Sequence, residues 1–243
     1  MNKDSPLFQH YKSKFAESPL FRGLPDDILL DMLDHFHPVS WDKGVKSDPA
    51  SLVDCFYLII NGRVKMEYID AATGNWVTLF VLGPGDGFDI ISLLDGNPHE
   101  ATPVALEDMQ LLTASTAKMR EWINLHPIFN QNFLPYLGER MRKMEDLVAD
   151  LGLKDTITRL AHLILRHTVE GTPGSDSVHP VKLIHDLTNE SLAHMIGSTR
   201  QAVNRHLQEL RKKGILERHP RHLVVRELEA LKKQADAYLS HRG

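Results

Sequence analysis

The sequence of 243 residues has one cysteine, Cys55, and no apolar run that approaches the roughly 18 to 20 residues of a membrane-spanning helix. A single cysteine excludes an internal disulfide, a CxxC redox pair and an iron–sulfur cluster held by four thiolates of one chain. The polar beginning, MNKDSPLFQHYKSKF, lacks the apolar core of a secretory signal peptide. We therefore expect a cytoplasmic protein that does not contact a membrane.

Signatures of several enzyme classes are missing as well. The sequence has no GxSxG nucleophile motif, no HExxH zinc motif and no phosphate-binding loop. A metal-dependent jelly-roll enzyme needs about three histidines and a carboxylate that converge inside the barrel. Residues 50–117 contain one histidine, His99, so the sequence predicts a protein that is not an enzyme and has no such metal site.

Acidic and basic residues are unevenly distributed along the chain. Residues 1–151 carry 13 Lys and Arg against 22 Asp and Glu, whereas residues 152–243 carry 15 against 10. A basic segment in an acidic protein indicates a polyanionic partner such as double-stranded DNA. It argues against a rival function, a signalling protein whose ligand-binding domain gates a partner protein.

Residues 39–117 have the pattern of short strands between turns. Apolar and charged side chains alternate with a period of two over residues 64–68, and Gly62, Gly74 and Gly85 fall where turns are needed. Many short strands at such spacing predict a β-roll or jelly roll.

Residues 127–153 have helical periodicity instead. Six apolar residues recur at steps of three and four, which is the heptad pattern of a helix that pairs with another helix. They are Leu134, Leu137, Met141, Met144, Val148 and Leu151. The simple interpretation is a homodimer along this helix, and the alternative is that the stripe packs on its own β-domain. Pro135 is expected to start or kink the helix.

Two short helices joined by a tight turn are predicted near the C-terminus. Thr188 can cap a helix that ends at Gly197, and Ser198 or Thr199 can cap a second helix that stops before Gly214. The following run, ILERHPRHLVVREL, has the pattern of a β-hairpin. Together these elements predict a winged helix-turn-helix.

The second of these helices has one apolar face, formed by Val203, Leu207 and Leu210. The opposite face carries arginine and amide side chains, which match the hydrogen-bonding groups of base edges in the major groove. The base-reading candidates are Arg200, Gln201, Asn204 and Arg205. The candidates for phosphate contacts, which fix register without reading sequence, are Thr188, Ser198, Thr199, Arg211, Lys212 and Arg221.

From SPLFRGLPDDIL to the wing, the sequence resembles the CRP/FNR family of bacterial transcription regulators. The runs YLIINGRVKM and LGPGDGF resemble the glycine-marked turns of its cyclic-nucleotide-binding-type β-roll, and STRQAVNRHL resembles its recognition helix. The resemblance implies an α+β fold: an N-terminal double-stranded β-roll (jelly roll), a long dimerisation helix and a C-terminal winged helix-turn-helix. It places Arg200 and Arg205 as base-reading arginines, and Gln201 where many members have glutamate.

The resemblance also divides the chain into three domains. Residues 1–126 are expected to form an effector-sensing β-roll domain with an N-terminal helical segment, residues 127–153 the dimerisation helix, and residues 154–243 the DNA-binding domain. The first 17 residues can form a helix on the β-roll or on the partner copy. Besides DNA and a second copy, an activator of this family would contact RNA polymerase.

The nucleotide site of cyclic-AMP-binding members is altered. Asp89, Ile90 and Ile91 stand where those members have Gly-Glu-Leu, and Glu100–Ala101 stand where they have Arg-Ser. A carboxylate in place of the arginine repels a cyclic phosphate, so cyclic AMP is disfavoured. Met144 and Glu145 fall where such members place small hydroxyl residues against the adenine.

Another effector is therefore expected between the β-roll and the long helix. Its candidate contacts are Asp89, Ile90, His99, Glu100, Ala101, Met144 and Glu145. Alternatives of the same fold are a haem-based gas or redox sensor and a regulator that is active without ligand. The candidate haem ligands are His99, Cys55, His35, His37 and His126.

Overall fold

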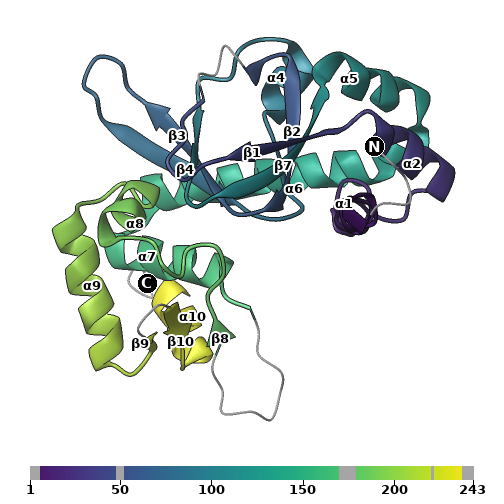
Figure 1. Cartoon of the computed structure of the whole chain (residues 1–243). Helices are drawn as coiled ribbons and strands as arrows, with labels where there is room; N and C mark the ends of the chain where they lie inside the picture. The colour runs from purple at the N-terminus through teal and green to yellow at the C-terminus, as the bar shows by residue number, and fades with distance from the viewer. Residues whose placement is uncertain (1–5, 48–51, 170–178, 220–221, 237–243) are drawn as a thin grey trace. The chain divides into compact units, whose positions relative to one another are not determined.

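The computed structural model describes residues 6–47, 52–169, 179–219 and 222–236 (Figure 1). The chain divides into two compact units. The first consists of Met1–Asn75 and Phe80–Lys143, and the second of Trp76–Leu79 and Met144–Gly243. Within the described residues no helix is long and apolar enough to span a membrane.

Two antiparallel sheets form the β-roll, as the strand and turn pattern predicted. One sheet has the order β1-β7-β2-β5, and the other has the order β4-β3-β6. The strands of the first sheet are β1 (His37–Trp41), β7 (Met109–Ser115), β2 (Cys55–Asn61) and β5 (Gly87–Phe88). Those of the second are β4 (Trp76–Leu82), β3 (Val64–Ile69) and β6 (Thr102–Ala105). Cys55, at the start of β2, is partly buried and unpaired by any disulfide.

The turn between β2 and β3 requires glycine. Gly62 has a φ of +89°, and a Cβ built there would lie 2.8 Å from the Met109 side chain and 2.9 Å from the Asp108 carbonyl oxygen. Any other residue would combine an unfavourable backbone conformation with a steric clash. The glycine therefore allows β3 to leave β2 close to the start of β7.

Helices cover the four-stranded sheet and complete an aromatic core. They are α1 (Pro6–Glu17), α2 (Asp26–Asp34), α4 (Ile90–Asp95) and α5 (Thr116–Leu125). From α1, Phe8, Tyr11 and Phe15 are buried in the same cluster as Phe36 and Trp122. Within one copy of the chain, the N-terminal helix thus packs on its own β-roll.

The long helix α6 runs over Pro127–Leu153 and has two apolar faces. Phe129, Phe133 and Tyr136 recur at i, i+4 and i+7, and all three are buried in the core of the first unit. Pro135 lies inside the helix, so it does not start the helix.

In its described residues, the second unit contains four further helices and a three-stranded sheet. The helices are α7 (Thr156–Arg166), α8 (Asn189–Met195), α9 (Arg200–Lys212) and α10 (Leu228–Asp236). The sheet has the order β8-β10-β9, with β8 (His179–Pro180), β9 (Leu216–His219) and β10 (His222–Val225). β9 and β10 are antiparallel, so the predicted hairpin is present, while its expected His219–Pro220 turn falls partly outside the described residues.

Candidate DNA-binding surface and effector region

Local capping defines the helix-turn-helix. The Thr188 hydroxyl accepts a hydrogen bond from the Ser191 amide and starts α8, while the Thr199 hydroxyl accepts one from the Ala202 amide and starts α9. Each cap satisfies a backbone donor that has no partner within its helix. The predicted cap at Thr188 is confirmed, and Thr199 rather than Ser198 caps the second helix.

Gly197 closes the turn between the two helices. Its φ is +57°, and a Cβ there would lie 2.9 Å from the Leu151 side chain. The turn therefore needs glycine both for its backbone conformation and for the close approach of the end of α6.

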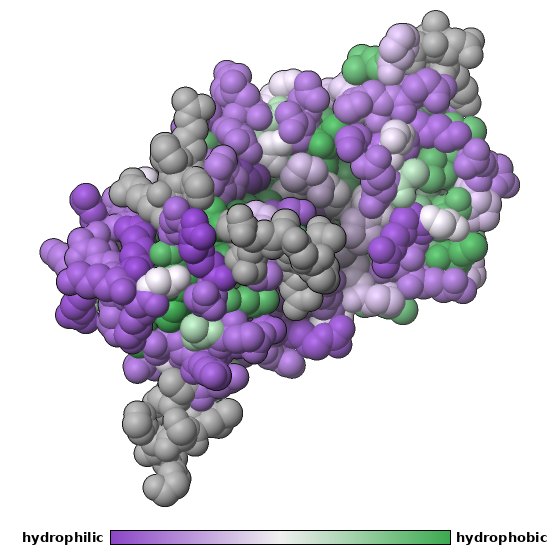
Figure 2. Space-filling model, turned by 90° about the horizontal axis from the view of Figure 1, so that it is seen from below, coloured by the Kyte–Doolittle hydropathy of each residue, from purple (hydrophilic) through white to green (hydrophobic). Residues whose placement is uncertain are grey.

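The two faces of α9 differ as the sequence predicted. Val203, Leu207 and Leu210 are almost completely buried, because this face packs against the rest of the unit. The opposite face exposes all four predicted base-reading residues, Arg200, Gln201, Asn204 and Arg205. In Figure 2, hydrophilic residues cover the left-hand end of the view, the side on which α9 lies in Figure 1.

The predicted phosphate-contacting residues differ in exposure. Lys212 and Thr199 are exposed, whereas Ser198 and Arg211 are partly buried. The hydroxyls of Thr188 and Thr199 already accept the capping bonds described above. Arg221 lies outside the described residues.

In the first unit, Asp89 is a buried carboxylate at the start of α4. It has a left-handed backbone conformation, with a φ of +63°, and is 5% exposed. The Ser92 hydroxyl donates to Asp89 Oδ1 at 2.7 Å, while Oδ2 has no hydrogen-bond partner among the described residues. Burial raises the pKa of Asp89 to about 6, although the Ser92 hydrogen bond acts in the opposite direction.

The other predicted effector residues have varied surroundings. Ala101 is buried, and Ile90 packs against the core of the first unit. Glu100 is exposed, and its Oε2 accepts a hydrogen bond from the Tyr68 hydroxyl at 2.5 Å. His99 is partly buried, and desolvation lowers its pKa, which favours the neutral imidazole.

Met144 and Glu145 lie on α6 at the start of the second unit. Met144 is partly buried and Glu145 is exposed. The residues around α4 belong to the first compact unit instead.

Sequence reasoning missed a polar cluster that ties α6 to the turn before β5. Arg140 Nη2 donates to Asp86 Oδ1 at 2.6 Å and to the Tyr136 hydroxyl at 2.5 Å. The amide of Gly87 also donates to this hydroxyl, at 3.1 Å. The turn belongs to the LGPGDGF motif and directly precedes Asp89, so α6 and the candidate effector region are mechanically connected.

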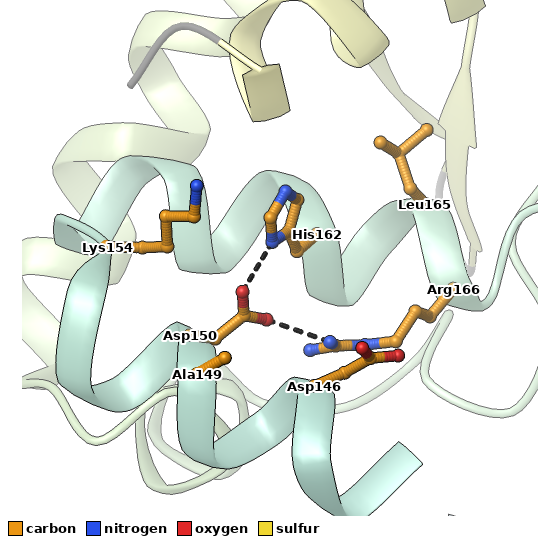
Figure 3. Close-up of a pocket in the computed structure, with 7 residues that line it drawn as sticks. All are labelled: Asp146, Ala149, Asp150, Lys154, His162, Leu165 and Arg166. Atoms are coloured by element: carbon orange, nitrogen blue, oxygen red, sulfur yellow. Dashed lines mark hydrogen bonds and ion pairs between the residues drawn. The ribbon is translucent and has the colours of Figure 1, made fainter. Parts of the chain in front are cut away.

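Another cluster lies where α6 meets α7 (Figure 3). Asp150, near the end of α6, is 2.6 Å from His162 Nδ1 and 2.8 Å from Arg166 Nη1, both on α7. The three side chains line a cavity of about 370 Å³. Its remaining lining residues are Asp146, Ala149, Lys154 and Leu165. Acidic and basic groups are both present in this lining, so the cluster is better suited to fixing the angle between the helices than to binding a charged ligand.

The predicted dimer seam on α6 is largely uncovered. Leu134, Met141 and Val148 are 62%, 65% and 66% exposed, and Leu151 is 38% exposed. Met144 is partly buried, and Leu137 packs partly against the core of the first unit. A stripe of large apolar side chains on a long helix is therefore available to a partner.

Two domain families match the sequence. The Crp-like helix-turn-helix domain matches residues 158–234, and the cyclic nucleotide-binding domain matches residues 49–126. The first match contains α8, α9 and the hairpin, and the second contains most of the β-roll together with α4 and α5.

Characterised relatives match most of the chain. The CRP-like cAMP-activated global transcriptional regulator of Mycobacterium tuberculosis is 25% identical over 224 residues, which cover 90% of this chain and 97% of that protein. The cyclic AMP receptor protein of Thermus thermophilus is 28% identical over 220 residues, with coverage of 90% and 97%. The global nitrogen regulator of Nostoc sp. is 29% identical over 191 residues, with coverage of 77% and 82%.

Solved structures share the fold. A variant of CooA from Carboxydothermus hydrogenoformans has a TM-score of 0.69 at 24% identity, and covers 84% of this chain and 90% of its own. FixK2 from Bradyrhizobium japonicum has a TM-score of 0.67 at 19% identity, with coverage of 82% and 96%. The two domain matches, in this order, and the curated relatives together identify a DNA-binding transcription regulator of the CRP/FNR type.

Proposed function

We propose that this regulator acts as a homodimer that reads an inverted-repeat operator with the α9 helix of each copy, under the control of a small effector other than cyclic AMP. The observation that carries the DNA-reading part is the exposed face of α9, where all four base-reading candidates are accessible while the opposite face is buried. Two such helices, related by a two-fold axis, would enter successive major grooves about one helical turn apart.

The contacts divide into two groups. Arg200, Gln201, Asn204 and Arg205 would face base edges and specify sequence. The phosphate group, Thr188, Ser198, Thr199, Arg211, Lys212 and Arg221, would fix the register of the protein on the duplex.

The exposed apolar stripe supports the dimer. Exposure of the apolar side chains of Leu134, Met141 and Val148 to water is unfavourable. A second α6 packed against them would bury this surface. In this proposal residues 127–153 form the dimerisation helix between a sensing domain, 1–126, and a DNA-binding domain, 154–243.

The effector part rests on two carboxylates. By the resemblance, the buried Asp89 carboxylate stands where cyclic-AMP-binding members have the glycine of Gly-Glu-Leu, and Glu100 stands where they have an arginine. Both would repel a phosphate, whereas a hydroxyl or amine donor could satisfy the Asp89 oxygen. The proposed effector is therefore a small molecule with hydrogen-bond donors, bound near Asp89, Ile90, His99, Glu100 and Ala101.

A haem-based sensor is the second candidate, and His99 favours it. Its Nδ1 is buried without a hydrogen-bond partner among the described residues, and its lowered pKa keeps the imidazole neutral, as a metal ligand must be. Haem bound there would supply gas or redox sensing.

The deciding experiment is a native mass spectrum and an absorption spectrum of the freshly purified, reduced protein. Its DNA binding is then measured on a randomised inverted-repeat duplex library with and without added cyclic AMP. A dimer that carries a small non-nucleotide mass and enriches specific duplexes without cyclic AMP supports the proposal. A Soret band favours haem, and a bare dimer that binds its operator favours a regulator active without ligand. Binding that requires cyclic AMP would contradict the effector proposal.

A further inference from the structure

A hydrogen bond joins the two helices of the helix-turn-helix at their exposed surface. Asn189 Nδ2, on the first residue of α8, donates to Asn204 Oδ1 on α9 at 3.2 Å. Asn204 is exposed and Asn189 is partly buried, and Asn204 is one of the base-reading candidates. It lies four positions after Arg200 and four positions before Gln208, so the three lie along one side of the helix.

The direction of this bond decides which end of the Asn204 amide is free. A carboxamide has an acceptor oxygen and a donor nitrogen, and asparagine reads adenine by using both at once. Here the oxygen is turned toward α8, and the nitrogen keeps both of its N–H groups for another partner. Guanine and thymine present keto oxygens in the major groove, whereas adenine and cytosine present amino groups.

We propose that Asn189 is a positioning residue that fixes the Asn204 amide so that its nitrogen faces the groove and selects keto bases over amino bases. The inference rests on the proposed function, because it assumes that α9 reads base edges. Asn189 itself need not touch DNA, since it acts by removing the freedom of the neighbouring amide to rotate.

The bond gains importance when the protein binds DNA. On a free surface, water competes for both amides and the bond contributes little. When the duplex covers the pair, water is excluded and the effective dielectric constant falls, so reversing the Asn204 amide alone would leave a buried donor opposite the Asn189 donor. The orientation present in the free protein is thus the one that the interface would preserve.

In the test, the full-length protein, three single variants and one double variant each select DNA from the randomised inverted-repeat duplex library, and competition assays follow. Asn204→Ala identifies the base position that Asn204 reads, because preference is lost there. Asn189→Ala removes the positioning bond. Asn189→Asp is nearly isosteric, and its carboxylate can accept but not donate, so the Asn204 nitrogen should turn toward it and leave the oxygen facing the groove. An acidic residue in the first turn also suits the α8 dipole, which protects folding.

The wild-type protein should prefer guanine or thymine at that position by about three- to tenfold, the value of one hydrogen bond in an interface. Asn189→Ala should weaken this preference, and Asn189→Asp should reverse it toward adenine or cytosine. In the Asn204→Ala background, Asn189→Asp should leave the preference at that position unchanged, because its effect passes through Asn204.

Three results would overturn the inference while leaving the proposed function intact. They are unchanged base preferences in both Asn189 variants, a reversed preference that persists without Asn204, and an equal affinity loss on all sequences with a smaller salt dependence. The last result would identify Asn189 as a phosphate contact. Enrichment of no sequence by the wild-type protein would contradict the proposed function itself.

Discussion

Asp150 on α6 and His162 on α7 are joined through Asp150 Oδ1 and His162 Nδ1 at 2.6 Å, across the bend between the two helices. The second carboxylate oxygen, Asp150 Oδ2, accepts a hydrogen bond from Arg166 Nη1 at 2.8 Å. One buried side chain therefore contacts two residues of the following helix. In the proposed regulator, α6 forms the dimer and α9 reads the DNA. These contacts join α6 to the helix that follows it along the chain on the way to α9.

Replacement of Asp150 by alanine should therefore destabilise the protein. The change leaves Arg166 without its carboxylate in a partly buried site, and we expect a loss of about 1–3 kcal/mol in the free energy of unfolding. Urea unfolding followed by circular dichroism measures it. Asp146 lines the same cavity but is exposed, so Asp146→Ala is the matched control and should change stability by less than about 0.5 kcal/mol. Equal effects of the two variants would show that the Asp150 contacts do not stabilise the joint.

The buried Asp89 predicts a pH dependence of stability. Its pKa is about 6 in the folded protein and 3.8 as the reference value for an unfolded chain, so the folded state binds the proton more tightly. The free energy of unfolding should then fall as the pH rises from about 4 to about 6. Asn cannot ionise and tolerates the left-handed backbone, so Asp89→Asn should be more stable at pH 7 by about 1–3 kcal/mol.

Thermal or urea unfolding at pH 4, 5, 6 and 7 measures this difference. The gain in the variant should vanish at pH 4, where Asp89 is protonated in the folded wild-type protein. Asp95→Asn, on the same helix, is the control, because backbone and side-chain hydrogen bonds from Asn97 lower the pKa of Asp95 and reverse the sign. A gain in the Asp89 variant that is the same at every pH would mean that burial of the charge is not its cause.

How far the sequence predicted the structure depended on the range of the interactions. The caps at Thr188 and Thr199 and the faces of α9 follow from residues within one or two helical turns, and they were predicted. The aromatic face of α6 was missed although its signal, Phe129, Phe133 and Tyr136 at helical spacing, was present. The sequence analysis assigned the apolar periodicity of this helix to the heptad seam on its other face.

Other features leave no local signal. Arg140 and Asp86 are 54 positions apart, and no spacing rule connects them. The Asp89 carboxylate was predicted near an effector by resemblance, but its burial and raised pKa depend on how α4 packs against the sheet. Similarly, the bond between Asn189 and Asn204 exists only because the turn brings two helices together.

The exposed stripe on α6 predicts how the dimer can be broken. Val148→Glu would place a charge opposite its own copy in the proposed seam, where it could not be solvated or paired. The dimer dissociation constant should rise at least about tenfold, as measured by sedimentation equilibrium. Arg142→Glu changes charge at an exposed α6 position outside the seam, and it should leave the dimer intact. A Val148→Glu protein with wild-type sedimentation would place the dimer interface elsewhere.

The two arginines of α9 predict a loss confined to specific DNA. Arg200 and Arg205 are exposed on the reading face, and an arginine that pairs with guanine contributes about 1–3 kcal/mol to discrimination at its base pair. Arg200→Ala or Arg205→Ala should therefore weaken binding to the selected operator by that amount, while affinity for random duplex changes little. Lys212→Ala is the comparison, because a lost phosphate contact lowers affinity for all sequences alike and reduces the salt dependence of binding by about one counterion. If the arginine variants lost affinity equally on operator and random DNA, with a smaller salt dependence, they would be phosphate contacts, and base reading would have to come from the amides of Gln201 and Asn204.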